Sequence, residues 1–147
     1  MLSTRWKKYD SVPVSHAQLK LDGHMLASSI GWILIASGII TVGGGIAALV
    51  SPALFLRLGF GVEDPTASAL FFVRHWGVLI VAIGALIVYS ADVQAIRTPV
   101  LVAAAAEKFA MGLFVFFGPV KRTDAMTAIS TLDGVFAILY VAYLAGI

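Results

Sequence analysis

The chain has 147 residues, of which 60% are hydrophobic and only 12% are charged; its formal net charge is +2 and it contains no cysteine. An ordinary soluble domain carries about 25% charged residues, so much of this apolar surface must face lipid rather than water. The small, dispersed positive charge argues against a nucleic-acid partner, and the lack of cysteine excludes a dithiol redox enzyme. The expected fold class is all-α, a polytopic membrane four-helix bundle.

The N-terminal segment, residues 1–24, is expected to be a juxtamembrane arm. It mixes basic and aromatic side chains in a pattern suited to anionic lipid headgroups. A cleaved signal peptide fits poorly, because the apolar stretch that follows the arm is longer than the ~7–15 residues of a signal-peptide core. Residues 25–147 are expected to form one domain of four transmembrane helices.

Four apolar segments are each long enough to cross a bilayer, which takes ~20 residues. Turn residues and charges separate them. The expected spans are residues 25–50, 66–91, 99–118 and 125–147. Within the first connection, residues 54–60 are too apolar for a solvated loop and too short to span, so we expect a stub lying in the membrane interface.

An even number of spans places both termini on one side of the membrane. Basic residues are more numerous on that side than on the other, so the positive-inside rule favours cytoplasmic termini, and the expected location is a bacterial inner membrane. The residues on the side of the termini are Arg5, Lys7, Lys8, Lys20 and Arg97, and those on the opposite side are Arg57, Lys121 and Arg122.

Small residues recur at helical spacing in the first two spans. Gly31, Gly38 and Gly45 are seven residues apart, and Gly77 is followed by Gly84 at the same interval. Such seams let helix backbones approach closely in lipid, where apolar area alone does not drive association. We therefore expect close contact along these glycines.

Five ionisable residues lie inside the expected spans, where each costs at least ~2.5–3.5 kcal/mol near the bilayer centre. Two enter span two and one enters span four from the same membrane side, to a similar depth of ~13 Å. The other two lie near the middle of span three. We expect all five to meet in one layer: Arg74, His75, Glu107, Lys108 and Asp133.

Two interpretations of this polar layer stay open. The formal charges cancel, as a buried network requires, so Arg74 paired with Asp133 or Glu107 would be a purely structural clamp between helices. Alternatively the layer binds a ligand, a substrate or a proton, because ionisable groups inside a membrane are functional candidates. Neighbouring helix positions point about 100° apart, so one of each adjacent pair is expected to face another helix or another subunit.

Two members of the layer have individual alternatives. His75 either makes an ordinary hydrogen bond, which we favour, or ligates heme or a metal. Lys108 lies too near the middle of its span to reach the interface easily by snorkelling.

Aromatic residues crowd the last two spans. We favour lipid-facing bulk and an aromatic belt; the alternative is the wall of a pocket for a flat apolar molecule, lined also by Ser130, Asp133, Gly134 and Ala137. The chain has no phosphate loop, no metal-ligand spacing and no catalytic triad, so ATP use and metallohydrolysis are not expected. The aromatic residues are Phe109, Phe114, Phe116, Phe117, Tyr140 and Tyr143.

Several short motifs occur together along residues 25–147. A proline ends the first span, Arg74-His75-Trp76-Gly77 lies in the second, and the third and fourth contain Glu107 and Asp133. In this outline the chain resembles small bacterial four-helix membrane proteins of the DoxX-like and DUF4345-like kind. The resemblance implies a four-helix fold and, because DoxX is associated with quinone-linked thiosulfate oxidation, a role beside a membrane redox system.

A weaker resemblance is to the membrane-bound styrene oxide isomerases. His75-Trp76-Gly77 is similar to their His-x-Gly motif, whose histidine ligates heme b between subunits, and Gly23-His24 is similar to their entry to span one. Glu107 matches an acidic residue of that family, but Met111 and Val115 stand where its substrate-contacting asparagine and tyrosine would fall. The resemblance therefore implies heme binding more than isomerase activity.

The function that we expect is binding of a lipophilic ligand, a quinone or a lipid, at the intramembrane polar layer. One alternative is a heme b-dependent isomerase acting on small apolar epoxides, and another is a structural subunit of a larger membrane complex. The expected partners are the lipid bilayer, a lipophilic small molecule, and a second copy or another membrane subunit. Whether the protein is an enzyme is left open.

Overall fold

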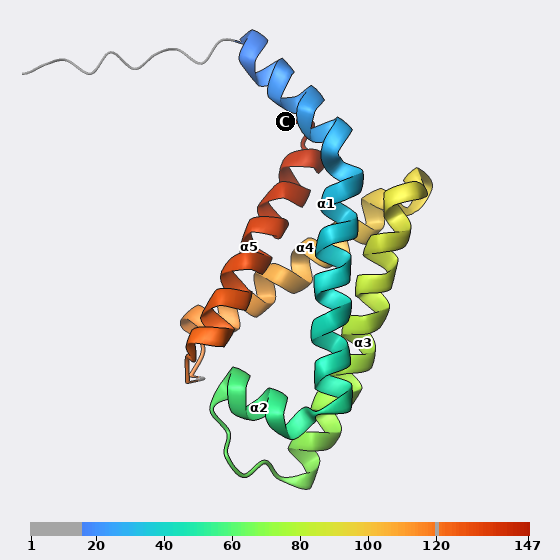
Figure 1. The fold of residues 1–147 in the computed structure, drawn as a ribbon. Helices are drawn as coiled ribbons and strands as arrows, with labels where there is room; N and C mark the ends of the chain where they lie inside the picture. The colour runs from blue at the N-terminus through green and yellow to red at the C-terminus, as the bar shows by residue number, and fades with distance from the viewer. Residues whose placement is uncertain (1–15, 120) are drawn as a thin grey trace, which may run out of the picture.

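The computed structural model describes residues 16–119 and 121–147, and side chains from Ser29 onward. Residues 1–15 of the expected arm lie outside the described residues. The described part contains five α-helices and no strand, which confirms the all-α prediction (Figure 1). The helices are α1 (His16–Val50), α2 (Pro52–Phe60), α3 (Ala67–Asp92), α4 (Gln94–Phe117) and α5 (Asp124–Leu144).

Four of these helices are long and apolar enough to cross a membrane: α1 through Ser29–Val50, and the whole of α3, α4 and α5. This confirms the four-span prediction and makes the protein an integral membrane protein. The third span begins earlier than expected, at Gln94, and Pro99 lies inside it. Five helical residues, 94–98, precede the proline, so the span starts more than one turn before it.

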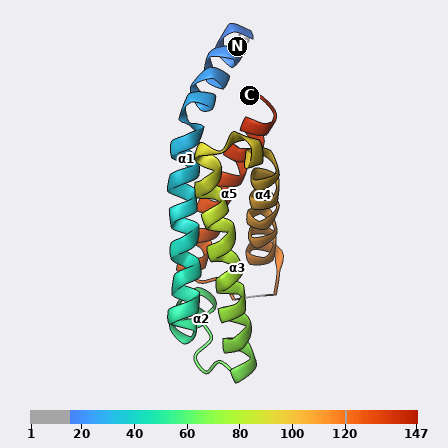
Figure 2. The same cartoon turned by 90° about the vertical axis from the view of Figure 1, so that its right-hand side faces the viewer.

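The helices α1 and α3 run side by side in both views, in opposite directions (Figure 2). A Cβ atom built on Gly45 would lie 2.8 Å from the backbone oxygen of Gly77, and one built on Gly84 would lie 3.0 Å from the oxygen of Gly38. These distances leave no space for a side chain. The predicted glycine seam is confirmed for these four residues but not for Gly31, whose Cβ would meet nothing within 4 Å.

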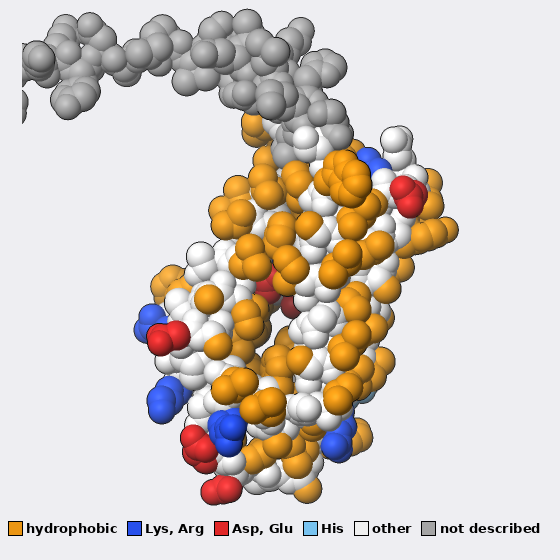
Figure 3. Space-filling view, in the orientation of Figure 1, with side chains coloured by type: hydrophobic (Ala, Val, Ile, Leu, Met, Phe, Trp, Pro, Cys, Tyr) orange, Lys and Arg blue, Asp and Glu red, His pale blue; other side chains and the backbone are white. Residues whose placement is uncertain are grey.

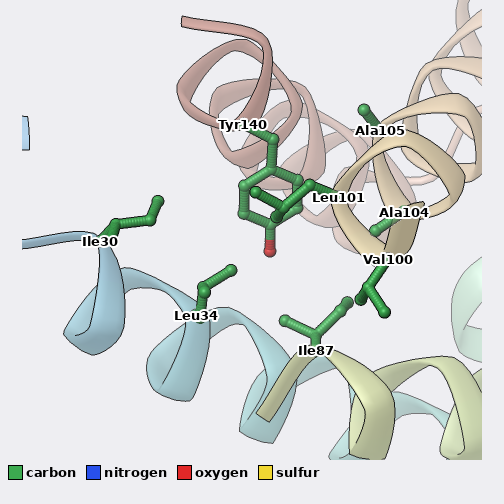
Figure 4. Close-up of a cluster of buried hydrophobic side chains, with 8 residues drawn as sticks. All are labelled: Ile30, Leu34, Ile87, Val100, Leu101, Ala104, Ala105 and Tyr140. Carbon is green, nitrogen blue, oxygen red and sulfur yellow. The ribbon is translucent and has the colours of Figure 1, made fainter. Parts of the chain in front are cut away.

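The hydrophobic core lies toward the end of the bundle that holds the C-terminus. All four long helices contribute to it, and the ring of Tyr140 packs among aliphatic side chains with its hydroxyl directed toward α1 (Figure 4). Tyr140 is fully buried, so the belt interpretation is wrong for this residue. The buried core residues are Ile30, Leu34, Ile87, Val100, Leu101, Ala104, Ala105 and Tyr140.

The opposite end of the bundle is closed by α2, so the stub expected at residues 54–60 is helical. Pro52 occupies the first turn of α2, where no N–H is needed. The helix ends at Phe60 and is capped by Gly61, whose φ of 66° is left-handed. The Thr123 hydroxyl donates to the carbonyl oxygen of Gly59 at 2.6 Å, and the ring of Phe55 lies 5.6 Å from that of Trp76. These contacts tie α2 to α5 and α3.

Candidate functional site

A charged side chain lies in the interior of the bundle. Lys108 belongs to the inward stripe of α4, three or four residues from Ala104 and Ala105, and only 2% of its surface is exposed. Because this stripe faces the other helices, the ammonium group points into the bundle. Lys108 therefore needs an internal partner.

That partner is Asp133 of α5. The Nζ atom of Lys108 donates to Oδ1 of Asp133 and, at 3.3 Å, to the hydroxyl of Thr41 on α1. This is the only ion pair in the described residues. The ion pair joins α4 to α5, and the hydrogen bond to Thr41 adds α1, in a medium where an unpaired charge is costly.

Two more hydroxyl groups extend this cluster. Ser37 of α1 and Tyr140 of α5 share a hydrogen bond, and the Thr41 hydroxyl donates to the carbonyl oxygen of Ser37 at 2.9 Å. Ser37 and Thr41 were not predicted as site residues from the sequence. Their spacing contained the signal, because both continue the stripe of α1 that includes Leu34 and Gly45.

Glu107 lies beside this cluster and is half-buried. The charges of Lys108 and Asp133 act on its carboxylate, and both carboxylates act on the Tyr140 hydroxyl. Acidic side chains are visible at the bottom of a hollow between α5 and α1 (Figure 3). Glu107 and Asp133 are the carboxylates that lie well inside the described spans, so the sequence correctly grouped them with Lys108.

Arg74 and His75 do not join this layer, and the expectation that all five residues meet is wrong for these two. Both are exposed on α3, and neither pairs with a carboxylate in the described residues. Lys108 contacts α1 at Thr41, which lies midway between Gly38 and Gly45. The partners of these two glycines on α3 are Gly84 and Gly77, so the level of Thr41 corresponds to Val81 of α3. Arg74 lies seven residues away, or ~10 Å along the helix.

Arg74 and Asp133 lie a similar number of residues from the start of their spans, but they do not lie at the same depth in the bundle. The helix α3 continues beyond the layer toward α2, whereas α5 crosses the bundle at an angle (Figure 1). The role expected of Arg74, a cation facing Asp133, belongs to Lys108 instead.

Ser130 carries a buried hydroxyl without a partner. It is 1% exposed, and its Oγ has no hydrogen bond in the structure. It lies on the inward stripe of α5, one turn from Met126 on one side and one turn from Asp133 on the other. Burying a hydroxyl without a hydrogen bond costs ~1–3 kcal/mol of stability, so a ligand or a water molecule that bonded to this atom would be stabilised.

An apolar cavity of about 260 Å³, open on one side and lined mostly by exposed residues, lies on the α2 side of the polar cluster. Gly44 of α1 is one turn from Thr41, and Met126 of α5 is one turn from Ser130, so the cavity and the cluster are consecutive along both helices. The lining residues include Gly44, Ala47, Leu54, Leu58, Met126 and Ile129. The bundle thus places an apolar cavity next to a polar layer.

Arg97 was expected to be a loop cation and is instead buried near the start of α4. Its Nε donates to the carbonyl oxygen of Ser90 at 2.9 Å, its Nη2 to that of Ala91 at 2.6 Å, and its Nη1 to the hydroxyl of Tyr143 at 3.2 Å. The two carbonyl groups belong to the last turn of α3, where a cation is favourable. Arg97 therefore holds the ends of three helices together.

Among the residues that the structure describes, no group of three or more His, Cys, Asp or Glu side chains could hold a metal ion. The chain matches no protein-family model, no curated protein and no solved structure with which it was compared.

Proposed function

We propose that this integral membrane protein binds a lipophilic ligand with a polar head group, a quinone or a lipid. The tail would occupy the cavity beneath α2, and the head group would lie at the Lys108–Asp133 layer. The observation that carries the proposal is the unpartnered hydroxyl of Ser130, which lies between the cavity and the ion pair.

The size of the cavity supports a tail rather than a whole molecule. Drug-sized ligands occupy roughly 300–1,000 Å³, so about 260 Å³ suits part of an acyl or isoprenoid chain. The cavity walls supply apolar contact, and the buried polar groups of the Lys108–Asp133 layer lie beyond one end of the cavity. This division of chemistry matches an amphipathic ligand.

The test compares two neighbouring glycines of α1. A Cβ atom on Gly43 or Gly44 would meet nothing within 4 Å, but only Gly44 lines the cavity. In a neutral detergent, a decyl-substituted benzoquinone and a lysophospholipid are titrated while the melting temperature is followed. At least one should stabilise the wild type and Gly43→Phe but not Gly44→Phe, and no stabilisation by either probe would contradict the proposal.

Ser130→Ala provides a second test, with two readouts. Removing a buried hydroxyl that lacks a partner should stabilise the empty protein, by up to ~1–3 kcal/mol. The same change should weaken ligand binding by about tenfold, the loss of one hydrogen bond. If Ser130→Ala destabilises the empty protein and leaves binding intact, the hydroxyl serves the fold instead.

A heme b-dependent isomerase is the second candidate, and the exposure of His75 favours it. The cavity contains no histidine, so a heme within one chain would have no imidazole ligand there. Only a heme held between two copies would fit, with His75 as the iron ligand on the outer face of α3. Glu107 and Asp133 lie in the interior and would not orient the second ring nitrogen.

An absorption spectrum separates the two candidates. Protein made in heme-replete cells should show a Soret band that His75→Ala abolishes if heme is bound. An absent band, together with normal behaviour of His75→Ala, would leave the quinone or lipid candidate. In either case the resemblance to DoxX-like proteins remains a proposal.

The orientation is proposed on charge alone. Cytoplasmic termini in a bacterial inner membrane follow from the positive-inside rule. Reporter fusions at the C-terminus and after Glu63, in the connection between α2 and α3, test it, because the two should report opposite sides of the membrane.

A further inference from the structure

The polar layer has an excess of negative charge. Since Arg74 lies elsewhere, the layer contains one ammonium group, that of Lys108, and two carboxylates, those of Glu107 and Asp133. A head group that enters this layer meets a formal charge of one negative unit. Cations are attracted there and anions are repelled, with less screening than in water.

The hydrogen-bonding capacity of the layer points the same way. Lys108 is 2% exposed and its Nζ already uses two of its three N–H donors, on Asp133 and Thr41, so only one buried N–H is left for an anion. Asp133 uses only Oδ1 in its ion pair and stays 18% exposed. Glu107 forms no ion pair in the described residues. Carboxylates only accept hydrogen bonds when ionised, so most of the unused capacity is that of an acceptor, and the Ser130 hydroxyl can donate or accept.

A hollow opens on the surface between α5 and α1 (Figure 3). Acidic side chains are visible at its bottom (Figure 3), and the apolar cavity lies on its α2 side. A molecule entering from the bilayer between α1 and α5 would meet the carboxylates with its head and the cavity with its tail.

We infer that the site prefers a hydrogen-bond-donating cation as head group, a lipophilic primary amine, over a carboxylate or a phosphate. The inference rests on the proposed function and adds the chemistry of the head group. A charge-assisted hydrogen bond is about twice as strong as a neutral one. An ammonium head group both attracts the negative layer and donates hydrogen bonds to its carboxylates. Glu107 is the carboxylate that recognises it, because Asp133 already neutralises Lys108.

One competing arrangement makes the opposite prediction. Arg57, Lys121 and Arg122 are exposed at the α2 end of the bundle. An anionic amphiphile could place its head group on these cations and its tail in the same cavity from the other side. The sign of the preferred charge therefore tells which end of the cavity holds the head group.

The experiment uses three probes with the same ten-carbon tail: decylamine, decanol and decanoate. Each is titrated at pH 7.5 into the purified full chain in a neutral maltoside detergent, and the melting temperature is recorded. Decylamine should reach its half-maximal shift at a concentration about tenfold lower than decanol, and decanoate should be the weakest. Gly44→Phe measures nonspecific effects of the probes, and Gly43→Phe is its matched control.

Glu107→Gln should abolish the preference for the amine over the alcohol, whereas Glu63→Gln, which removes the same charge from an exposed loop, should keep it. Equal or better stabilisation by decanoate would overturn the inference, and so would an unchanged amine-to-alcohol ratio in Glu107→Gln. If none of the probes stabilises the protein more than it stabilises Gly44→Phe, the proposed function itself fails. If decanoate stabilises the protein best and Gly44→Phe removes that stabilisation, only the inference about the head group is overturned, and the proposed function stands.

Discussion

Two interfaces within this bundle differ in what holds them together. Between α1 and α3, glycines pack directly against the backbone of the other helix. A Cβ atom on Gly45 would lie 2.8 Å from the backbone oxygen of Gly77, and one on Gly77 would lie 2.8 Å from that of Gly45. Between α1 and the α4–α5 pair, the contacts are core side chains near the C-terminus and two hydrogen bonds, from Lys108 to Thr41 and between Tyr140 and Ser37, and a cavity remains near α2. The first interface is filled and the second is not.

This difference follows from the physics of helices in lipid. Apolar area gives no drive for association there, so helices join through close van der Waals packing or through polar contacts. Close packing uses all the space between two helices. Polar contacts hold helices at a few points and leave room between them, which is why the candidate site lies in the second interface.

The largest loss of stability should come from removing the charge of one partner of the Lys108–Asp133 ion pair. Asp133→Asn leaves the Lys108 ammonium buried without its counter-charge, and the expected loss is ~3–5 kcal/mol in the free energy of unfolding. Unfolding in mixed micelles of dodecyl sulfate and maltoside measures it. The double variant Lys108→Met with Asp133→Leu should recover most of the loss, because an apolar pair of similar volume can replace a buried ion pair. An unchanged stability of Asp133→Asn would mean that the ion pair does not hold α4 and α5 together.

The second prediction concerns the filled interface. Gly45→Leu forces a side chain against the backbone oxygen of Gly77, and overpacking of this kind costs ~1–3 kcal/mol or separates the two helices. Gly43→Leu is the control, since its Cβ would meet nothing within 4 Å. The same unfolding assay should show a loss for Gly45→Leu alone. Equal losses for both variants would point to leucine itself rather than to the seam.

The sequence predicted the parts of this fold that depend on composition and spacing. Long apolar runs were enough to give the four spans, and the seven-residue interval was enough to give the seam of Gly38, Gly45, Gly77 and Gly84. Lys108 was placed correctly with Asp133 because both lie far from the ends of their spans. These features are encoded locally along the chain.

Which face of each helix points inward was harder to predict. A helix in lipid is apolar on both its inner and outer faces, so hydrophobicity does not mark the buried side as it does in water. Hydropathy therefore does not distinguish Tyr140, which is buried, from Arg74, which is exposed. The better marker was the stripe of small polar residues, Ser37 and Thr41 on α1 and Ser130 on α5, each of which faces the interior.

The third prediction tests the hydroxyl contact that links α1 and α5. Tyr140→Phe removes its hydrogen bond to Ser37 while the ring keeps its place in the core, so the expected loss is ~0.5–1.5 kcal/mol. Ser37 also has the carbonyl oxygen of Leu34 within reach at 3.3 Å, which spares it a further penalty. A double-mutant cycle with Ser37→Ala should give a coupling energy of similar size. A coupling near zero would assign the loss to ring packing instead.

The smallest effect is expected at Arg74, the cation that the sequence placed in the layer. Arg74 is exposed on α3 and forms no ion pair with a described residue, so Arg74→Gln should change the free energy of unfolding by no more than ~0.5 kcal/mol. Measured beside Asp133→Asn in the same micelles, it separates the two descriptions of the layer. If Arg74 reached the carboxylates, removing it would leave two negative charges facing one ammonium group and the loss would approach that of Asp133→Asn. A loss below one fifth of that value would instead support Lys108 as the cation that the bundle depends on.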